Sequence, residues 1–514
     1  MNNYKITRIL LFVLITGCLA MSTGCKKQLE TKVYSNLTPD NFYKSEGDAN
    51  AALISLYIPF TSYWGNPDPG TGQWYAGLYN ADIKSYLSKS LVSTDEIYNE
   101  GGGANTADLF NFTWGSSSWT FPGYGPGGAN DAVYGKISYV AKATETINSI
   151  NNSSAVSDAV KKSYIAQAKT LRAWLMYVLY DFYGPVNVKT DFATLTDTAA
   201  TTRPTEAVYI AQMEKDLTEA MPDLADKYNS NAANWGRVGK GLARMILLKT
   251  YMHTKQWAKA ETVAREIMTM GFSLLTGPSG YKNVFINKAN AELIYAVPAN
   301  AASANWWAQE VFPLDFKSAP DFGIAPRSSG WLTQYMPWFF YDKYEATDIR
   351  RNTTILDRYT NTANLVKDKS NGMKGALPLK YTFIPLPGDA QPVDVVVYRY
   401  AEVLLSLAEA INEKNAGPNA EAYSLVNQVR ARAGVSDFSG MNQAQFRLAL
   451  LDERGRELYG EGARRQDLIR NGTYISNAIA RGKTNAKPFM VLYPIPSGII
   501  IQSRGVITQN AGYN

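Results

Sequence analysis

The chain has 514 residues, of which 46% are hydrophobic, so it is long enough to bury one large core or two moderate ones. Its 51 basic and 45 acidic residues give a formal net charge of +6, and no run of five or more Lys or Arg occurs. Nucleic-acid binding needs basic residues gathered on one face, so this scatter argues against it. The two cysteines, Cys18 and Cys25, both lie near the amino terminus, so the rest of the chain forms no disulfide.

Residues 1–24 have the features of a secretory signal. Basic residues come first, then an apolar stretch at residues 9–21, then the small residues 22–24 directly before Cys25. The apolar stretch is too short to span a membrane. A cysteine in this position is similar to the lipidated cysteine of bacterial lipoproteins, so we predict lipidation at Cys25. Cys18 is a competing match.

Helical patterns dominate the chain after this segment. Apolar residues three and four apart run from Leu171 to Phe182, and Gly184 with Pro185 ends the pattern. Two pairs of amphipathic segments follow, residues 238–251 with 256–270 and residues 403–411 with 422–429, and each pair resembles a tetratricopeptide unit. The repeat period is not fixed, so we expect one solenoid-like scaffold of divergent helical hairpins.

Short strands are expected at residues 293–297 and 395–398. Long irregular segments rich in aromatic residues, Gly and Pro lie at residues 63–79, 101–128 and 299–388. Loops of this length inside a compact domain usually carry function.

An exposed aromatic ring can stack on the apolar C–H face of a sugar while polar neighbours bind the hydroxyl groups. We therefore predict ligand contacts for five tryptophans of the long loops: Trp74, Trp114, Trp306, Trp307 and Trp331. The aromatic residues 338–341 are assigned to the core instead, because they lead into an expected helix at residues 342–351.

Catalytic chemistry has few candidate residues in this chain. There is one histidine, His253, interpreted as a helix cap or surface residue, and no cysteine beyond the amino-terminal two. Glu457 and Glu461 form a carboxylate pair of the kind that glycosidases use, but each lies within a helical turn of an arginine. Arginine neighbours favour the ionised carboxylate, so a structural ion-pair network is predicted, with no catalytic residue, no metal and no cofactor.

A series of short motifs runs along nearly the whole mature chain. The most specific joins residues 168–174, AKTLRAW, to residues 180–185, YDFYGP. Others occur in order at residues 25–30, 41–43, 48–53, 203–205, 237–251, 292–295, 398–410, 429–434, 453–470, 493–496 and 509–513. Together they resemble the SusD/RagB family of nutrient-binding outer-membrane lipoproteins.

The resemblance implies a mainly α fold, a tetratricopeptide-like helical scaffold with long loop excursions and a few short strands. It implies capture of an oligosaccharide at the outer membrane and delivery to a SusC-like TonB-dependent channel, with no reaction catalysed. The family does not conserve its ligand contacts, so no site residue can be assigned by motif. Lys26 and Lys27 follow Cys25 where relatives exported to the surface often have acidic residues, which leaves open the face of the membrane.

The expected organisation is a signal peptide at 1–24, an N-terminal region at 25–230, a linking helical pair at 231–290 and a C-terminal region at 291–514. Three other functions stay open at this point. They are a peptide-binding relative that uses the same kind of channel, a lipid-anchored glycoside hydrolase, and a scaffold that binds only proteins.

Overall fold

The computed structural model describes residues 43–62, 66–67, 74–75, 77–99, 104–115, 133–300, 305–322, 324, 330–382 and 391–513. The predicted signal peptide, Cys18 and Cys25 lie outside these residues. In the part of the chain so described, no helix combines the length and apolarity needed to cross a membrane.

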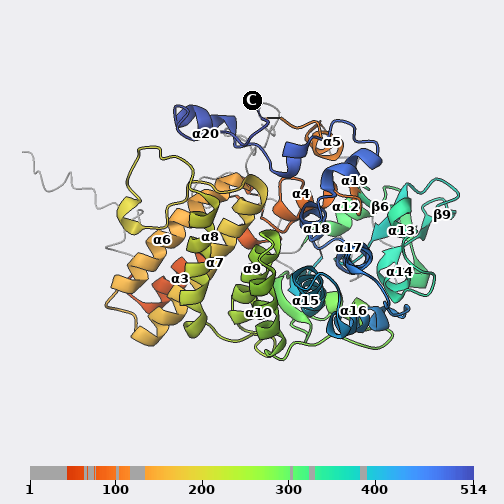
Figure 1. Cartoon of the computed structure of the whole chain (residues 1–514), viewed down its shortest axis with the longest axis horizontal. Coiled ribbons are helices and arrows are strands. Elements are labelled where there is room, and N and C mark those ends of the chain that lie inside the picture. Colours follow the sequence, from red (N-terminus) through yellow and green to blue (C-terminus); the bar gives the residue numbers. More distant parts are fainter. Residues whose placement is uncertain are drawn as a thin grey trace, which may run out of the picture.

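The fold is mainly α, as expected. Long helices follow one another across the molecule from left to centre in Figure 1, and α7 packs on α6 and α8, α10 on α9 and α15, and α15 on α16 and α17. The bounds are α3 Glu46–Ser55, α6 Ile137–Asn152, α7 Asp158–Tyr183, α8 Glu206–Ala220, α9 Lys240–His253, α10 Trp257–Met268, α15 Tyr400–Lys414, α16 Ala420–Ala433 and α17 Gln443–Leu458. Both predicted helical pairs are confirmed, as α9 with α10 and α15 with α16.

Helix α7 lies at the centre of the largest cluster of buried apolar side chains, which includes residues from Leu53 to Tyr513. Its Trp174 is fully buried and stacks on Phe60 with ring centroids 3.9 Å apart. The helix ends where predicted. Its C-cap Gly184 takes φ 69° and ψ −164°, a backbone conformation that is found almost only in glycine.

Short helices and strands occupy the remaining described residues. The helices are α4 Tyr86–Val92, α5 Ala104–Asn111, α11 Gly280–Ile286, α12 Trp307–Val311, α13 Trp338–Tyr341, α14 Ile349–Thr354, α18 Arg464–Arg470, α19 Tyr474–Ala480 and α20 Ser497–Gln502. The strands are β1 Asn66–Pro67, β2 Trp74–Tyr75, β3 Tyr98–Asn99, β4 Leu293–Val297, β5 Phe316–Ser318, β6 Gln334–Pro337, β7 Ile355–Leu356, β8 Arg358–Asn361, β9 Val366–Asp368, β10 Gly375–Pro378 and β11 Val395–Arg399.

The two predicted strands are confirmed as β4 and β11, which pair antiparallel with each other. A four-stranded sheet has the order β3-β6-β10-β7, and β5, β8 and β9 form another sheet. The predicted helix at residues 342–351 is wrong over its first seven residues, which form turns. Asp348 takes an extended conformation and its side chain accepts from the backbone N–H of Arg350, so it begins α14 at Ile349 as an N-cap. The domain boundaries at 230/231 and 290/291 stay predictions.

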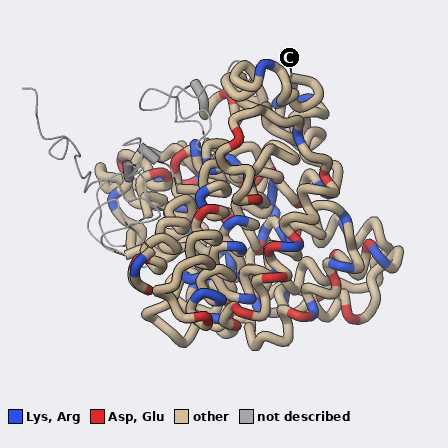
Figure 2. The backbone as a smooth tube through the Cα atoms, turned by 90° about the vertical axis from the view of Figure 1, so that its left-hand side faces the viewer, with Lys and Arg blue, Asp and Glu red and all other residues tan. Residues whose placement is uncertain are grey.

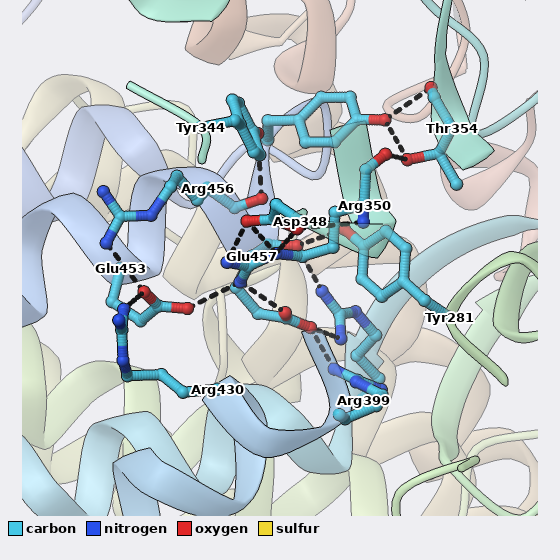
Figure 3. Close-up of polar contacts among 12 residues, drawn as sticks. Tyr281, Tyr344, Asp348, Arg350, Thr354, Arg399, Arg430, Glu453, Arg456 and Glu457 are labelled. Carbon is cyan, nitrogen blue, oxygen red and sulfur yellow. Dashed lines mark hydrogen bonds and ion pairs between the residues drawn. The ribbon is translucent and has the colours of Figure 1, made fainter. Parts of the chain in front are cut away.

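A buried network of ion pairs joins the C-terminal elements (Figure 3). Glu457 of α17 accepts from three arginines on different elements: Arg350 of α14 at 3.0 Å, Arg399 at the end of β11 at 2.5 Å, and Arg432 of α16. Arg399 and Arg432 also bind Glu292 at 2.9 and 2.7 Å. These side chains are at most 1% exposed, so each charge depends on its partners for compensation.

The arginines keep the buried carboxylates ionised. Burial by itself raises the pKa of Glu457, but the charges of Arg432, Arg399 and Arg350 outweigh it and hold the pKa well below its ordinary value. In the same way Arg350, with two further arginines, lowers the pKa of Glu453 to about 2 against the effect of burial. The network therefore stabilises the fold only while these carboxylates stay deprotonated.

This network predicts a loss of stability in acid. The folded-state pKa values of Glu453 and Glu457 lie below the value of about 4.3 for an unfolded glutamate, so their contribution is present above that pH and is lost as the pH falls through the folded-state values. We expect the free energy of unfolding, measured by urea titration, to hold down to about pH 5 and to fall steeply from there towards about pH 2.

The variant Glu457→Gln removes a negatively charged partner from three buried arginines. Its free energy of unfolding should be roughly 3–5 kcal/mol lower at neutral pH and should change less as the pH falls. Glu214→Gln is the matched control, because Glu214 pairs with Lys259 near the surface, where the two side chains are 27% and 53% exposed. This variant should lower the free energy of unfolding by less than about 1 kcal/mol. Equal losses in the two variants would contradict the role given to the network.

The end of α7 gives a second prediction. Gly184→Ala should lower the free energy of unfolding by about 1–3 kcal/mol, because alanine must adopt a backbone conformation nearly reserved for glycine. Gly498→Ala in α20 is the control, since an added Cβ there meets no atom within 4 Å. Thermal unfolding followed by circular dichroism compares them, and an unchanged midpoint for Gly184→Ala would contradict the assignment.

Candidate functional site

A cavity of about 530 Å³ opens where the four-stranded sheet meets α13 and α19. Its wall combines aromatic rings with charged and amide side chains. The lining residues are Asp95, Tyr98, Tyr335, Pro337, Phe339, Lys343, Lys374, Asn477, Ala480 and Arg481.

Strand pairing sets the positions of the aromatic rings. Tyr98 of β3 lies opposite Tyr335 of β6, with the ring centroids 6.0 Å apart. Pro337 ends β6 and is the N-cap of α13, which places Phe339 in the first turn of that helix. The Phe339 ring is 5.9 Å from that of Tyr98 and is 45% exposed, whereas Tyr335 is buried. One ring thus faces solvent with two others supporting it.

The polar wall is held by a chain of hydrogen bonds. Asp95, in the bend between α4 and β3, receives two bonds from Arg464 of α18, at 2.7 and 2.8 Å. Its Oδ2 also accepts from Asn477 Nδ2 at 3.1 Å, and Asn477 Oδ1 accepts from Arg481 Nε at 2.9 Å. Arg481 follows α19 directly and donates from Nη2 to the carbonyl of Ser93 at 3.2 Å. The guanidinium orientation is therefore fixed by neighbours on two elements.

Asp95 is the single carboxylate among the described residues of the wall, and both of its oxygens accept hydrogen bonds. Burial raises the pKa of Asp95, but the charge and hydrogen bonds of Arg464, with smaller effects from Lys343 and Arg481, bring it down to about 2. Asp95 is thus ionised at neutral pH and positioned as a structural acceptor. It lacks the raised pKa that a general acid requires.

The cavity is equipped to bind a ligand by stacking and hydrogen bonding. An exposed ring can cover an apolar ligand face while the fixed amide and guanidinium bind polar groups at its edge. Among the described residues, no group of three or more His, Cys, Asp or Glu side chains is arranged to hold a metal ion.

Four of the five tryptophans predicted from the sequence, Trp114, Trp306, Trp307 and Trp331, are not among the described residues that line this cavity. Trp114 and Trp307 are only 3% and 4% exposed: Trp114 Nε1 donates to the Tyr513 hydroxyl at 2.8 Å, and the Trp307 ring packs 5.5 Å from that of Tyr381. Both are core residues in this structure and present no free face to a ligand.

The other three predicted tryptophans lie in different surroundings. Trp331 is 45% exposed and comes three residues before β6, and Trp306 is half-buried as the N-cap of α12. Trp74 belongs to β2, and its side chain lies outside the described part of the chain. Trp331 and Trp306 thus stay partly exposed candidates, which lie just before β6 and α12 in the sequence.

Phe339 was missed by the sequence analysis. The assignment of residues 338–341 to the core is correct for Phe340 and Tyr341 but wrong for Phe339, because Pro337 turns the chain from β6 into α13 and directs that ring outward. Tyr98 and Arg481 were missed as well, since strand pairing and the end of α19 bring them together from distant parts of the sequence. The Met-Pro-Trp-Phe turn was the only local signal.

A larger cavity of about 910 Å³ lies between α8 and residues 187–204. Its wall is rich in threonine, and the aromatic residue in that wall, Tyr209, is 1% exposed. Among the described residues of this wall there is no exposed ring of the kind that stacking needs. It is therefore a weaker candidate than the aromatic cavity.

The carboxylate pair considered for glycosidase chemistry is structural. Glu461 binds Lys380 and Arg399 at 2.6 and 2.8 Å and is 4% exposed, and Glu457 is enclosed by arginines as described above. His253 ends α9, and burial lowers its pKa to about 4, so it is neutral at pH 7.

Glu310 of α12 is half-buried and, unlike Glu457 and Glu461, has a raised pKa. Burial, followed by the charge of Asp82, raises this pKa to about 8.

Comparison with known proteins agrees with this architecture. A family profile described as the SusD family matches residues 339–513, and one described as "Starch-binding associating with outer membrane" matches residues 78–237. A SusD-like protein of Formosa agariphila is 25% identical to the chain, with 96% of each protein covered.

Two further relatives are informative. The starch-binding protein SusD of Bacteroides thetaiotaomicron is 22% identical, covering 87% of this chain and 88% of its own. A solved laminarin-binding SusD-like protein superposes with a TM-score of 0.72 at 22% identity, covering 92% of this chain and all of its own. The helical scaffold, the ordered motifs and these matches together show that the chain belongs to the SusD/RagB family.

Proposed function

We propose that this protein binds oligosaccharides at the outer membrane through the aromatic cavity and passes them to a SusC-like TonB-dependent channel without chemical change. The observation that carries the proposal is the exposed Phe339 ring beside the fixed Asn477 and Arg481 side chains. A sugar offers both complementary features, an apolar C–H face and a rim of hydroxyl groups.

The names of the relatives support a glycan as the ligand. Starch is named for one of them and laminarin for another, and both proteins align over most of this chain. The volume of about 530 Å³ falls in the range of sites that hold small ligands. Because the cavity is open on one side, we expect modest affinity, which suits capture followed by release.

The predicted tryptophans extend this proposal beyond the cavity. Trp331 and Trp306 precede β6 and α12, two elements that pack on each other, so we expect a longer glycan to extend from the cavity past these two elements. Trp331 is 45% exposed and is the stronger of the two candidates.

Removal of the exposed ring tests the binding site. Phe339→Ala should weaken oligosaccharide binding about threefold to tenfold, because one stacked ring contributes roughly 0.5–1.5 kcal/mol. Phe192→Ala is the matched control: this phenylalanine is 48% exposed and lies in the segment beside the threonine-rich cavity. Isothermal titration against a glycan panel measures both variants.

Other outcomes of this titration separate the alternatives. Weaker binding in Phe192→Ala alone would move the site to the larger cavity, and binding of peptides but no glycan would favour the peptide-binding function. Product analysis after long incubation tests hydrolysis. Turnover that disappears in Glu310→Gln would make the protein an enzyme, since the raised pKa of Glu310 gives it the protonation state of a general acid.

Lipid anchoring at Cys25 is part of the proposed function and is tested separately. Cys25→Ser should move the expressed protein from the membrane fraction to the soluble fraction, because the acyl chains that hold it can no longer be attached. Cys18→Ser is the control and should leave the protein in the membrane fraction. The reverse pattern would place the lipid on Cys18.

A further inference from the structure

The charges of the aromatic cavity specify its ligand more narrowly. We infer that the cavity selects acidic oligosaccharides, which bear carboxylate or sulfate groups, and that the Arg481 guanidinium binds the anionic group while the sugar ring stacks on Phe339. This inference rests on the proposed function, because it names the class of glycan that the same cavity binds.

Among the described residues of the cavity wall, cationic side chains outnumber anionic ones. Lys343, Lys374 and Arg481 contribute three positive charges, and Asp95 contributes one negative charge. The whole chain has a formal net charge of only +6, and Figure 2 shows Lys and Arg interspersed with Asp and Glu along the backbone. Such a local excess raises the concentration of anionic ligands at the site.

The carboxylate of Asp95 does not cancel this excess. Its two oxygens are taken by Arg464 at 2.7 and 2.8 Å, and Asn477 adds a third hydrogen bond. Arg464 is itself buried and does not line the cavity, so the pair is neutral within the protein. The lowered pKa of Asp95 agrees with a surrounding field that is positive.

Lys343 differs from Arg481 in its partners. Lys343 forms an ion pair with Asp452 at 2.9 Å, which reduces its contribution to the cavity. Arg481 donates to the Asn477 amide oxygen and to the Ser93 carbonyl, which are both neutral, and no carboxylate lies within ion-pair distance of it among the described residues. Its positive charge thus interacts with Asp95 only at a distance and forms an ion pair with no described carboxylate.

One donor of the Arg481 guanidinium has no hydrogen-bond partner among the described residues. Nε and Nη2 are used, whereas Nη1 is buried from solvent and makes no hydrogen bond to any described residue. An unpaired buried donor is costly, and a carboxylate or sulfate oxygen satisfies it with a charge-assisted bond. A hydroxyl group of a neutral sugar also satisfies the donor but leaves the charge unbalanced.

Pairs of glycans that differ only in charge test this inference. Oligogalacturonate and its methyl ester share one sugar backbone, and a sulfated oligosaccharide with its desulfated form gives a second pair. We expect the acidic member of at least one pair to bind roughly tenfold more tightly, which is about 1.4 kcal/mol, because its anionic group forms a charge-assisted hydrogen bond with Arg481. Arg481→Ala should remove this difference. Arg358→Ala is the control, since Arg358 is exposed and lies outside the cavity wall.

The wild-type protein gives a test that needs no variant. Binding of the acidic glycan should weaken when the sodium chloride concentration rises from about 0.05 to 0.5 M, whereas stacking of a neutral sugar should change little. The salt dependence of the wild-type protein still tests the inference if Arg481→Ala does not fold, because Ser93 and Asn477 lose their hydrogen-bond partner in that variant.

The outcomes separate this inference from the proposed function. If neutral and acidic glycans bind equally and both weaken in Phe339→Ala, the cavity binds glycans and the preference for acidic ones is overturned. If no glycan binds at any salt concentration, the proposed function fails and the inference fails with it. Tighter acidic binding that is salt-sensitive and lost in Arg481→Ala supports both.

Discussion

The three arginines around Glu457 are the constraint on which the C-terminal half of the fold depends. Arg350, Arg399 and Arg432 come from α14, β11 and α16, and without α17 in its place each would lose a buried carboxylate partner. The loss of one partner in such a network costs far more than the net stability that the intact network contributes. The network therefore acts mainly to exclude other arrangements of these helices, since few of them could satisfy every charge.

The same principle extends from the core to the cavity. After α17 the chain turns through Glu461, which binds Arg399 and Lys380, and enters α18. Arg464 of α18 then binds Asp95, Asp95 binds Asn477, and Asn477 binds Arg481. Side chains held in this way lose little conformational freedom when a ligand arrives, which lowers the entropic cost of binding. A rigid, charge-paired scaffold thus prepares the polar wall of the cavity.

The sequence predicted the scaffold better than the site, and the reason is the range of the interactions. Apolar periodicity and the Gly184 stop are local, so α7, α9, α10, α15 and α16 were recognisable, as were β4 and β11. Trp114 and Trp307 cannot be told from ligand-stacking tryptophans by their local sequence. Only tertiary packing against Tyr513 and Tyr381 places them in the core. Conversely, Phe339 lies among core residues in sequence and is exposed because of one proline-induced turn.

The choice of residues in the cavity also bears on how a ligand leaves it. An arginine stays charged at every physiological pH, and an aromatic ring does not titrate, so neither Arg481 nor Phe339 can switch between binding and release by gaining or losing a proton. Asp95 is held ionised by Arg464, and the single histidine of the chain lies at the end of α9 and not in the cavity wall. Release of a ligand from this cavity would therefore have to come from competition for the ligand or from a change in the cavity's shape. A pH difference across the membrane cannot drive it through these residues.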